Sequence, residues 1–147
     1  NSAKEMFDAV IENLPVDVAI FSAAVADFKV KDISETKIKN KENYNLSLEN
    51  NIDILKHVSN HNSLRPKLVI GFSAETNYII ENSQKKINEK NCDWLIANDV
   101  SNQEIGFDSD FNEVSILYKN GEIEKISKDK KSVIANKIVK KIVSNLE

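Results

Sequence analysis

The chain has 147 residues, the length of a single domain, and a formal net charge of −3. This negative balance argues against a protein that binds nucleic acid through bulk charge. Its one cysteine, Cys92, excludes an internal disulfide bond and suits a reducing compartment, which we expect to be the cytoplasm. No apolar run approaches the ~18 residues of a membrane-spanning helix, so we expect no membrane partner.

Hydrophobic periodicity divides the chain into alternating helices and strands. Ser2 and Glu5 form a capping box, which marks the start of an amphipathic helix. Short, continuous apolar runs predict strands that are covered on both faces, as in a parallel sheet. The predicted elements, in chain order, are a helix over 3–13, a strand over 16–22, an exposed mobile loop over 29–44, a short strand over 44–48, a short helix over 53–60, a strand over 67–72, a helix over 77–90, a strand over 93–97, a hairpin over 113–126 and a helix over 132–146.

The alternation of strands and helices predicts one α/β domain with a mostly parallel sheet over residues 1–147. The hairpin is the strongest local signal. Asn120 and Gly121 separate two alternating segments, and this dipeptide favours a type I′ turn.

The end of the first buried strand predicts a ligand site. The run Ala23-Ala24-Val25-Ala26-Asp27 places small side chains and then a lone carboxylate directly after the strand. In a parallel α/β sheet, ligands bind outside the carboxyl ends of the strands, and small residues let a ligand approach the backbone. An unpaired carboxylate at the end of an apolar strand is costly, so we favour a role for Asp27 in binding a hydroxyl group or a metal ion.

Lysines supply the candidate anion ligands, but the residues alone leave their role open. Lys86 and Lys90 share one face of the predicted helix without an intervening acid, so they either complement the helix C-terminus or bind an anion. Lys37 lies in the polar loop, where composition favours a solvated side chain, and Phe72 at a strand end is by default a core residue. The three glycines of the chain build neither a Walker-A loop nor a G-x-G-x-x-G loop. Phosphates would therefore be held by lysines or by a glycine-rich loop outside this chain.

Six ordered blocks carry a family resemblance. The most specific is Ala-Asn-Asp-Val-Ser at 97–101, followed by Gly-Phe-x-x-Asp-x-Asn at 106–112; the others lie at 23–28, 37–39, 51–55 and 71–76. Together they resemble the synthetase domain of the bacterial bifunctional coenzyme A biosynthesis protein, phosphopantothenate–cysteine ligase. The resemblance implies a Rossmann-like three-layer sandwich, and a hairpin that forms an arm across a homodimer.

The resemblance also implies a reaction. In this family the carboxylate of 4′-phosphopantothenate attacks the α-phosphate of CTP, which gives an acyl-cytidylate and pyrophosphate. The amine of cysteine then displaces CMP and forms the amide. The implied partners are these three small molecules and Mg²⁺, and the protein mainly positions them and neutralises charge.

Residue by residue, the resemblance places the nucleotide at the rim of the sheet. Lys37 is expected to be catalytic by closing over the activated intermediate, and Ala23 is expected to let that intermediate pack against backbone. Asp27 is the expected Mg²⁺ ligand. The expected nucleotide contacts are Phe21, Ser22, Ala23, Asp27, Lys37, Ile52, Asp53, Ile54, Leu55, Phe72, Lys86 and Lys90.

The resemblance covers the whole chain but only the C-terminal part of the family domain, without its glycine-rich N-terminal part. Flavin mononucleotide (FMN) would be bound only by a fused decarboxylase domain outside this chain. We therefore expect the 147-residue chain by itself to bind CTP weakly and to form no amide. The alternative is a non-catalytic nucleotide-binding or dimerisation module.

Overall fold

The structure, a computed structural model, describes residues 2–34, 36–37, 39, 45–101 and 109–147. Its elements in chain order are α1 (Ala3–Glu12), β1 (Val18–Phe21), β2 (Phe28–Val30), β3 (Leu48–Asn50), α2 (Ile54–Ser59), β4 (Leu68–Glu75), α3 (Ile79–Lys90), β5 (Trp94–Asp99), β6 (Phe111–Tyr118), β7 (Ile123–Lys130) and α4 (Lys131–Leu146).

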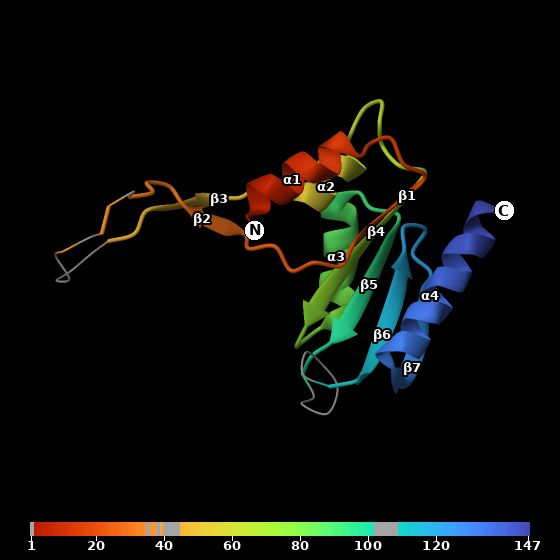
Figure 1. The fold of residues 1–147 in the computed structure, drawn as a ribbon. Helices are drawn as coiled ribbons and strands as arrows, with labels where there is room; N and C mark the ends of the chain where they lie inside the picture. The colour runs from red at the N-terminus through yellow and green to blue at the C-terminus, as the bar shows by residue number, and fades with distance from the viewer. Residues whose placement is uncertain (1, 35, 38, 40–44, 102–108) are drawn as a thin grey trace.

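A five-stranded sheet in the order β1-β4-β5-β6-β7 forms the centre of the molecule. β1, β4 and β5 pair in parallel, and β6 is antiparallel to both of its neighbours, so every strand except β6 runs in the same direction. Helices cover both faces of this sheet (Figure 1). The predicted α/β class, the mostly parallel sheet and the three layers are confirmed. In the described part of the chain, no helix is long and apolar enough to cross a membrane.

The face covered by α4 holds the larger core. Ile134, Ile138 and Ile142 recur once per turn of α4 and are buried against the sheet; burial of one such side chain stabilises the fold by about 1.5–3 kcal/mol. The ring of Trp94 packs edge-on against that of Tyr118, with centroids 5.3 Å apart. Three other apolar residues of α4 are about half exposed, so the buried face of this helix is narrow: Val139, Val143 and Leu146.

The opposite face is covered by α2 and α3. Ile87 of α3 is fully buried against β4 and β5. Gly71 lets Leu55 of α2 lie directly on β4, because a Cβ atom added at Gly71 would stand 2.6 Å from Leu55 Cδ2 and 3.0 Å from Leu95 Cδ1. Cys92 is also buried on this face, and burial raises the pKa of its thiol to about 11. This thiol is therefore inert at neutral pH.

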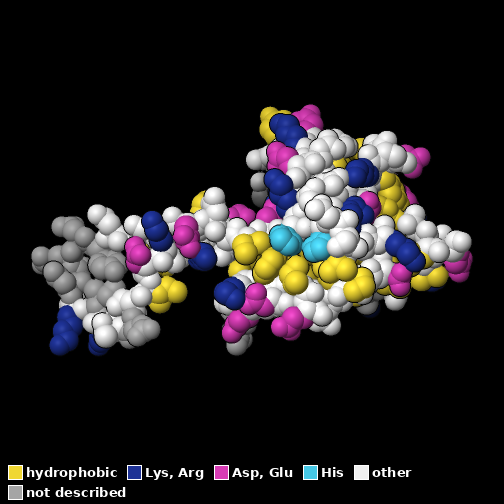
Figure 2. Space-filling view, turned by 90° about the horizontal axis from the view of Figure 1, so that it is seen from above, with side chains coloured by type: hydrophobic (Ala, Val, Ile, Leu, Met, Phe, Trp, Pro, Cys, Tyr) yellow, Lys and Arg dark blue, Asp and Glu magenta, His cyan; other side chains and the backbone are white. Residues whose placement is uncertain are grey.

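α1 packs near α2, on the face seen in Figure 2. The ring of Phe7 meets that of His57 edge-on at 4.9 Å, and His57 lies beside His61 on the surface (Figure 2). The predicted capping box is confirmed, since the Ser2 hydroxyl accepts from the Glu5 N–H at 3.1 Å and the Glu5 carboxylate accepts from the Ser2 N–H at 2.7 Å.

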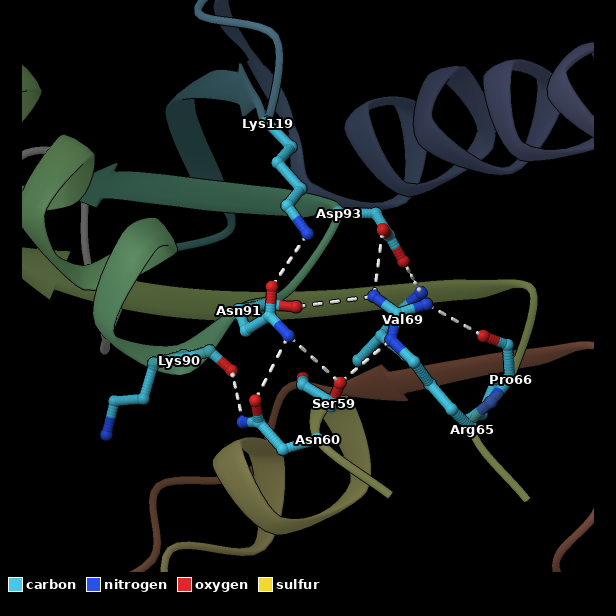
Figure 3. A network of polar contacts seen from close by, with 9 residues as sticks. All are labelled: Ser59, Asn60, Arg65, Pro66, Val69, Lys90, Asn91, Asp93 and Lys119. Carbon is cyan, nitrogen blue, oxygen red and sulfur yellow. Dashed lines mark hydrogen bonds and ion pairs between the residues drawn. The ribbon is translucent and has the colours of Figure 1, made fainter. Parts of the chain in front are cut away.

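Near the amino ends of β4 and β5, a polar network ties the helices to the sheet (Figure 3). The guanidinium of Arg65 donates to the carbonyls of Ser59 (2.8 Å), Pro66 (3.0 Å) and Asn91 (3.3 Å), and to the carboxylate of Asp93 (2.9 Å). The second oxygen of Asp93 accepts from the Val69 N–H at 2.7 Å. This network fixes the turn that leads into β4 and the turn that leads from α3 into β5.

Three predictions about the N-terminal half differ from the structure. β1 is not covered on both faces, because Ile20 is 48% exposed, and it is the edge strand of the described sheet. The first two residues of the loop predicted over 29–44 belong to β2, which pairs antiparallel with β3 in a ribbon that projects from the body (Figure 1). The predicted strand 44–48 is displaced to Leu48–Asn50, and Tyr44 lies outside the described residues. Pairing between segments about twenty residues apart leaves no local signal in either one.

The C-terminal hairpin is present, but it forms no projecting arm. β6 pairs with β5, so the hairpin completes the main sheet and is covered by α4. The turn also differs from the predicted type I′. The N–H of Gly121 donates to the Tyr118 carbonyl at 2.9 Å, and only Gly121, with φ 91°, has a positive φ in this turn. That geometry is a type I turn followed by a left-handed glycine.

Candidate functional site

A cavity of about 480 Å³ lies between the segment that follows β1, the first turn of α2 and the second half of α3. The apolar part of its lining includes the exposed ring of Phe72 at the end of β4. The structure gathers here every predicted nucleotide contact except Ser22 and Lys37. The residues concerned are Phe21, Ala23, Asp27, Ile52, Asp53, Ile54, Leu55, Phe72, Lys86 and Lys90.

One wall is the segment between β1 and β2. Its small side chains, Ala23 among them, are exposed to the cavity, and so is Asp27. Within the described part of the chain, the Asp27 carboxylate has no ion-pair or hydrogen-bond partner. The wall is held by Asn51, whose side-chain amide donates to the Ala26 carbonyl at 2.8 Å and whose backbone N–H donates to the Asp27 carbonyl at 2.8 Å. The Asp27 carboxylate is therefore exposed at the cavity, and its role in binding a ligand stays a prediction.

The opposite wall is the start of α2. Asp53 is the N-cap of this helix and accepts from the Lys56 N–H at 2.9 Å. The same carboxylate pairs with the ammonium of Lys90 from α3. The residue after Asp53, Ile54, is buried, so the start of α2 is anchored in the core. Ion pair and cap together fix the position of Lys90 at the edge of the cavity.

Lys86 is held by a buried acid. Its ammonium lies 2.6 Å from Oε1 of Glu75, whose side chain is only 9% exposed at the end of β4. The helix pattern showed no acid on the face shared by the two lysines, and their partners Glu75 and Asp53 approach from other elements. Helix spacing records only neighbours on the same helix. Since an ammonium has three donor hydrogens, each lysine can keep its acid and still donate to a phosphate.

The charges around the cavity favour a nucleotide that arrives with a cation. Lys86 and Lys90 are neutralised by Glu75 and Asp53, and Asp27 and Glu89 are further acids in the lining. The described residues include no group of three side chains that could hold a metal ion by themselves. Mg²⁺ is commonly bound by one or two carboxylates together with substrate phosphates. Asp27 fits that role, whereas a preformed metal centre does not.

Among the lining or supporting residues that were missed as site residues are Asn51, Glu75 and Glu89. Asn51 and Glu75 lie inside sequence blocks that carried the resemblance, but nothing local indicated what they contact. Glu89, next to Lys90 on α3, also lines the cavity. The default assignment of Phe72 to the core was wrong, because its ring is 37% exposed at the cavity. Lys37 lies beyond β2 in the projecting segment and is not among the residues that line the cavity.

A second, larger hollow of about 720 Å³ lies between the ribbon and the start of α1. Its lining is mostly the exposed side chains of the ribbon, such as Ile33 and Leu46, and it shares Asn51 with the first cavity. Lys86 and Lys90 do not line it, and its own lysines, Lys4 and Lys29, pair with the exposed acids Asp8 and Glu49. The smaller cavity is therefore the better candidate for an anionic ligand.

Comparison with known proteins decides the family. The profile described as "DNA/pantothenate metabolism flavoprotein C-terminal domain" matches residues 1–146. The chain belongs to this family. The family resemblance inferred from the sequence blocks is thereby confirmed.

Curated relatives agree with the profile. The coenzyme A biosynthesis bifunctional protein CoaBC of Haemophilus influenzae is 34% identical over 148 residues, which cover 99% of this chain and 36% of that protein. CoaBC of Bacillus subtilis is 37% identical over 122 residues, which cover 82% of this chain and 30% of that protein. The chain thus spans about a third of the length of these relatives.

Solved structures show the same fold. The crystal structure of the C-terminal domain of CoaBC superposes with a TM-score of 0.75 at 34% identity, over 99% of this chain and 63% of that one. The DNA/pantothenate metabolism flavoprotein of Streptococcus pneumoniae superposes with a TM-score of 0.74 over 100% of this chain and 69% of that one. At 20% identity, the second match supports the fold alone.

Proposed function

We propose that this chain forms the nucleotide-binding part of a phosphopantothenate–cysteine ligase that uses CTP in coenzyme A biosynthesis. The observation that carries the proposal is the cavity of about 480 Å³, which gathers the nucleotide contacts expected from the family. Membership of the family places the chain in pantothenate metabolism. The relatives are coenzyme A biosynthesis bifunctional proteins, which supports a role in that pathway.

The proposed reaction proceeds in two steps. An oxygen of the 4′-phosphopantothenate carboxylate bonds to the α-phosphorus of CTP as the bond to pyrophosphate breaks, which gives an acyl-cytidylate. The amine of cysteine then bonds to the acyl carbon, CMP leaves, and the amine loses a proton. In this scheme Lys86 and Lys90 bind the phosphates, and Ala23 leaves room for the acyl-phosphate beside the backbone. Lys37 closes over the intermediate and neutralises its charge.

Asp27 would hold Mg²⁺ together with the nucleotide phosphates. The bound ion would neutralise phosphate charge and orient the triphosphate. Phe72, Ile52 and Leu55 offer apolar contacts to the base and the ribose at the same cavity. We propose further that the active form is a homodimer and acts in the cytoplasm.

The proposal is tested with the protein produced at the full length of its open reading frame. CTP, 4′-phosphopantothenate and Mg²⁺ should release pyrophosphate, and CMP should follow only when cysteine is added. ATP in place of CTP should give much less of either product. Binding of CTP without any amide would instead favour the non-catalytic module.

Lys37→Ala isolates the catalytic role. We expect this substitution to reduce turnover by about a hundredfold or more while it changes CTP affinity little, because Lys37 does not line the cavity. Lys31→Ala, on the same projecting segment, is the matched control and should retain turnover. Unchanged turnover in Lys37→Ala would remove Lys37 from the mechanism.

A further inference from the structure

Asn51 joins the two walls of the nucleotide cavity. It directly follows β3 and stands two residues before Asp53, the N-cap of α2. Its backbone N–H donates to the carbonyl of Asp27 at 2.8 Å, and its side-chain Nδ2 donates to the carbonyls of Ala26 at 2.8 Å and Phe28 at 3.3 Å. One residue thus holds three consecutive carbonyl groups of the opposite wall.

The clamped wall has little else to hold it. Apart from the ladder of the sheet, every hydrogen bond described for the backbone of residues 23–27 involves Asn51. The side chains of this segment are small and mostly exposed, so they bury little apolar surface. Segments with few buried contacts open at low free energy. The position of Ala23 and Asp27 therefore depends on Asn51.

The orientation of the Asn51 amide is fixed by these contacts. Both carbonyls that Nδ2 approaches are acceptors, so the amide nitrogen and not the amide oxygen must face them. An aspartate has the same shape but only acceptor oxygens when it is ionised. Placed here, its carboxylate would face two carbonyl oxygens.

We propose that Asn51 is a positioning residue that clamps the 23–28 segment to the start of α2 and thereby sets the affinity of the cavity for its ligand. Asn51 acts through Asp27 and through Asp53, which holds Lys90, rather than by chemistry of its own. The identity of the ligand, CTP, rests on the proposed function. The clamp itself rests only on the contacts of the protein.

Hydrogen exchange tests the clamp without any nucleotide. In full-length protein, Asn51→Ala should increase amide exchange about tenfold in the 23–28 segment and at the start of α2, while exchange in β4 and β5 stays unchanged. Asn50→Ala is the matched control, because Asn50 is exposed and its side chain has no hydrogen bond within the described chain. Equal exchange in Asn51→Ala and wild type, or faster exchange throughout the sheet, would overturn the proposal.

Calorimetric titration with Mg²⁺ and CTP tests the consequence for the site. We expect Asn51→Ala to weaken CTP binding about tenfold, the equivalent of one or two lost hydrogen bonds, and to raise KM for CTP more than it lowers kcat. Asn51→Asp should weaken binding further, because it adds repulsion to the lost donors. Asn50→Ala should bind CTP as the wild type does.

The two measurements separate the two claims. Faster exchange in Asn51→Ala with unchanged CTP affinity would overturn Asn51 as a positioning residue. An Asn51→Asp variant that binds CTP as well as wild type would do the same, because donation to the two carbonyls would then be dispensable. A wild-type protein that binds no CTP would refute the proposed function, and the exchange experiment would still decide whether the clamp exists.

Discussion

The polar network around Arg65 and the cavity around Asp27 use charged residues in opposite ways. In the network, Arg65 has four acceptors and both oxygens of Asp93 accept hydrogen bonds (Figure 3). At the cavity, Lys86 and Lys90 each have one acid, and Asp27 has no partner among the residues that the structure describes. Saturated groups serve the fold, whereas groups with free donors or acceptors remain available to a ligand.

Lys90 belongs to both regions. Its carbonyl accepts a long hydrogen bond of 3.4 Å from the Asn60 side chain in the network, while its ammonium reaches Asp53 at the cavity (Figure 3). The polar network therefore fixes the end of α3, and this places the Lys90 side chain at the cavity. This contrast predicts that substitutions in the two regions separate stability from binding.

The largest expected effect is that of Arg65→Ala on stability. The pair of Arg65 and Asp93 is about three-quarters buried, so the substitution leaves a carboxylate without its cation and should lower the free energy of unfolding by about 3 kcal/mol. CTP affinity of the folded fraction should stay within about twofold of wild type, because Arg65 does not line the cavity and Asp53 still holds the Lys90 side chain. Urea unfolding and calorimetric titration measure the two quantities.

Lys67→Ala provides the control for Arg65→Ala. Its ion pair with Asp17 is exposed, with side chains 77% and 72% accessible, and such pairs contribute little. We expect no measurable change in stability. Loss of CTP affinity at unchanged stability in Arg65→Ala would contradict the division between the two regions.

Lys86→Ala should affect both properties. It leaves the buried carboxylate of Glu75 unpaired, which should cost about 2 kcal/mol of stability, and it removes a phosphate ligand. Lys90→Ala should cost less stability, about 1 kcal/mol, because Asp53 is about one-third exposed and still caps α2.

The double variant Lys86→Ala/Glu75→Gln sharpens that test. It removes both charges together, so it should recover much of the stability without recovering CTP affinity. Titration with CMP beside CTP shows which phosphates are bound. If Lys86→Ala weakens CMP and CTP equally, Lys86 does not bind the terminal phosphates.

Gly71→Ala should narrow the cavity by displacing Leu55, which lines it. The new Cβ would stand 2.6 Å from Leu55 Cδ2, and the exposed side of Leu55 faces the cavity, so the leucine should move into the ligand's space. We expect CTP affinity to fall about tenfold with a stability loss of about 1 kcal/mol. Gly71→Ala/Leu55→Ala should recover part of the affinity, and a double variant no better than the single one would contradict this mechanism.

The smallest expected effect concerns Asp99 and pH. Hydrogen bonds from the Ser101 hydroxyl at 2.6 Å and backbone N–H at 2.9 Å hold the pKa of Asp99 below its ordinary value. A lowered folded-state pKa stabilises the protein above the unfolded pKa of about 4 and stops doing so as the pH falls through the folded value. Asp99→Ala should therefore cost about 1 kcal/mol at pH 7 and progressively less below pH 4. A loss that does not depend on pH would assign the effect to packing.

Local patterns predicted the regular elements well. The capping box at Ser2 marked the start of α1, and the spacing of Ile134, Ile138 and Ile142 marked the buried face of α4. These signals lie within one helix turn or one strand, where the sequence alone contains all the interacting residues. Local patterns could not predict that β2 pairs with β3 or that β1 is exposed, because each of these features depends on a distant segment of the chain.

The sequence by itself determined the α/β class, the family and most of the residues that line the cavity. Apolar periodicity and sequence blocks depend only on residues that are close together in the chain, so both can be recognised without the structure. Only the tertiary structure decided that Glu75 and Asp53 neutralise Lys86 and Lys90, and that Asn51 clamps the wall that carries Asp27. Each of these contacts joins elements that are separate in the chain. Which residues meet in these contacts depends on how α2 and α3 pack on the sheet, and no local sequence pattern specifies that packing.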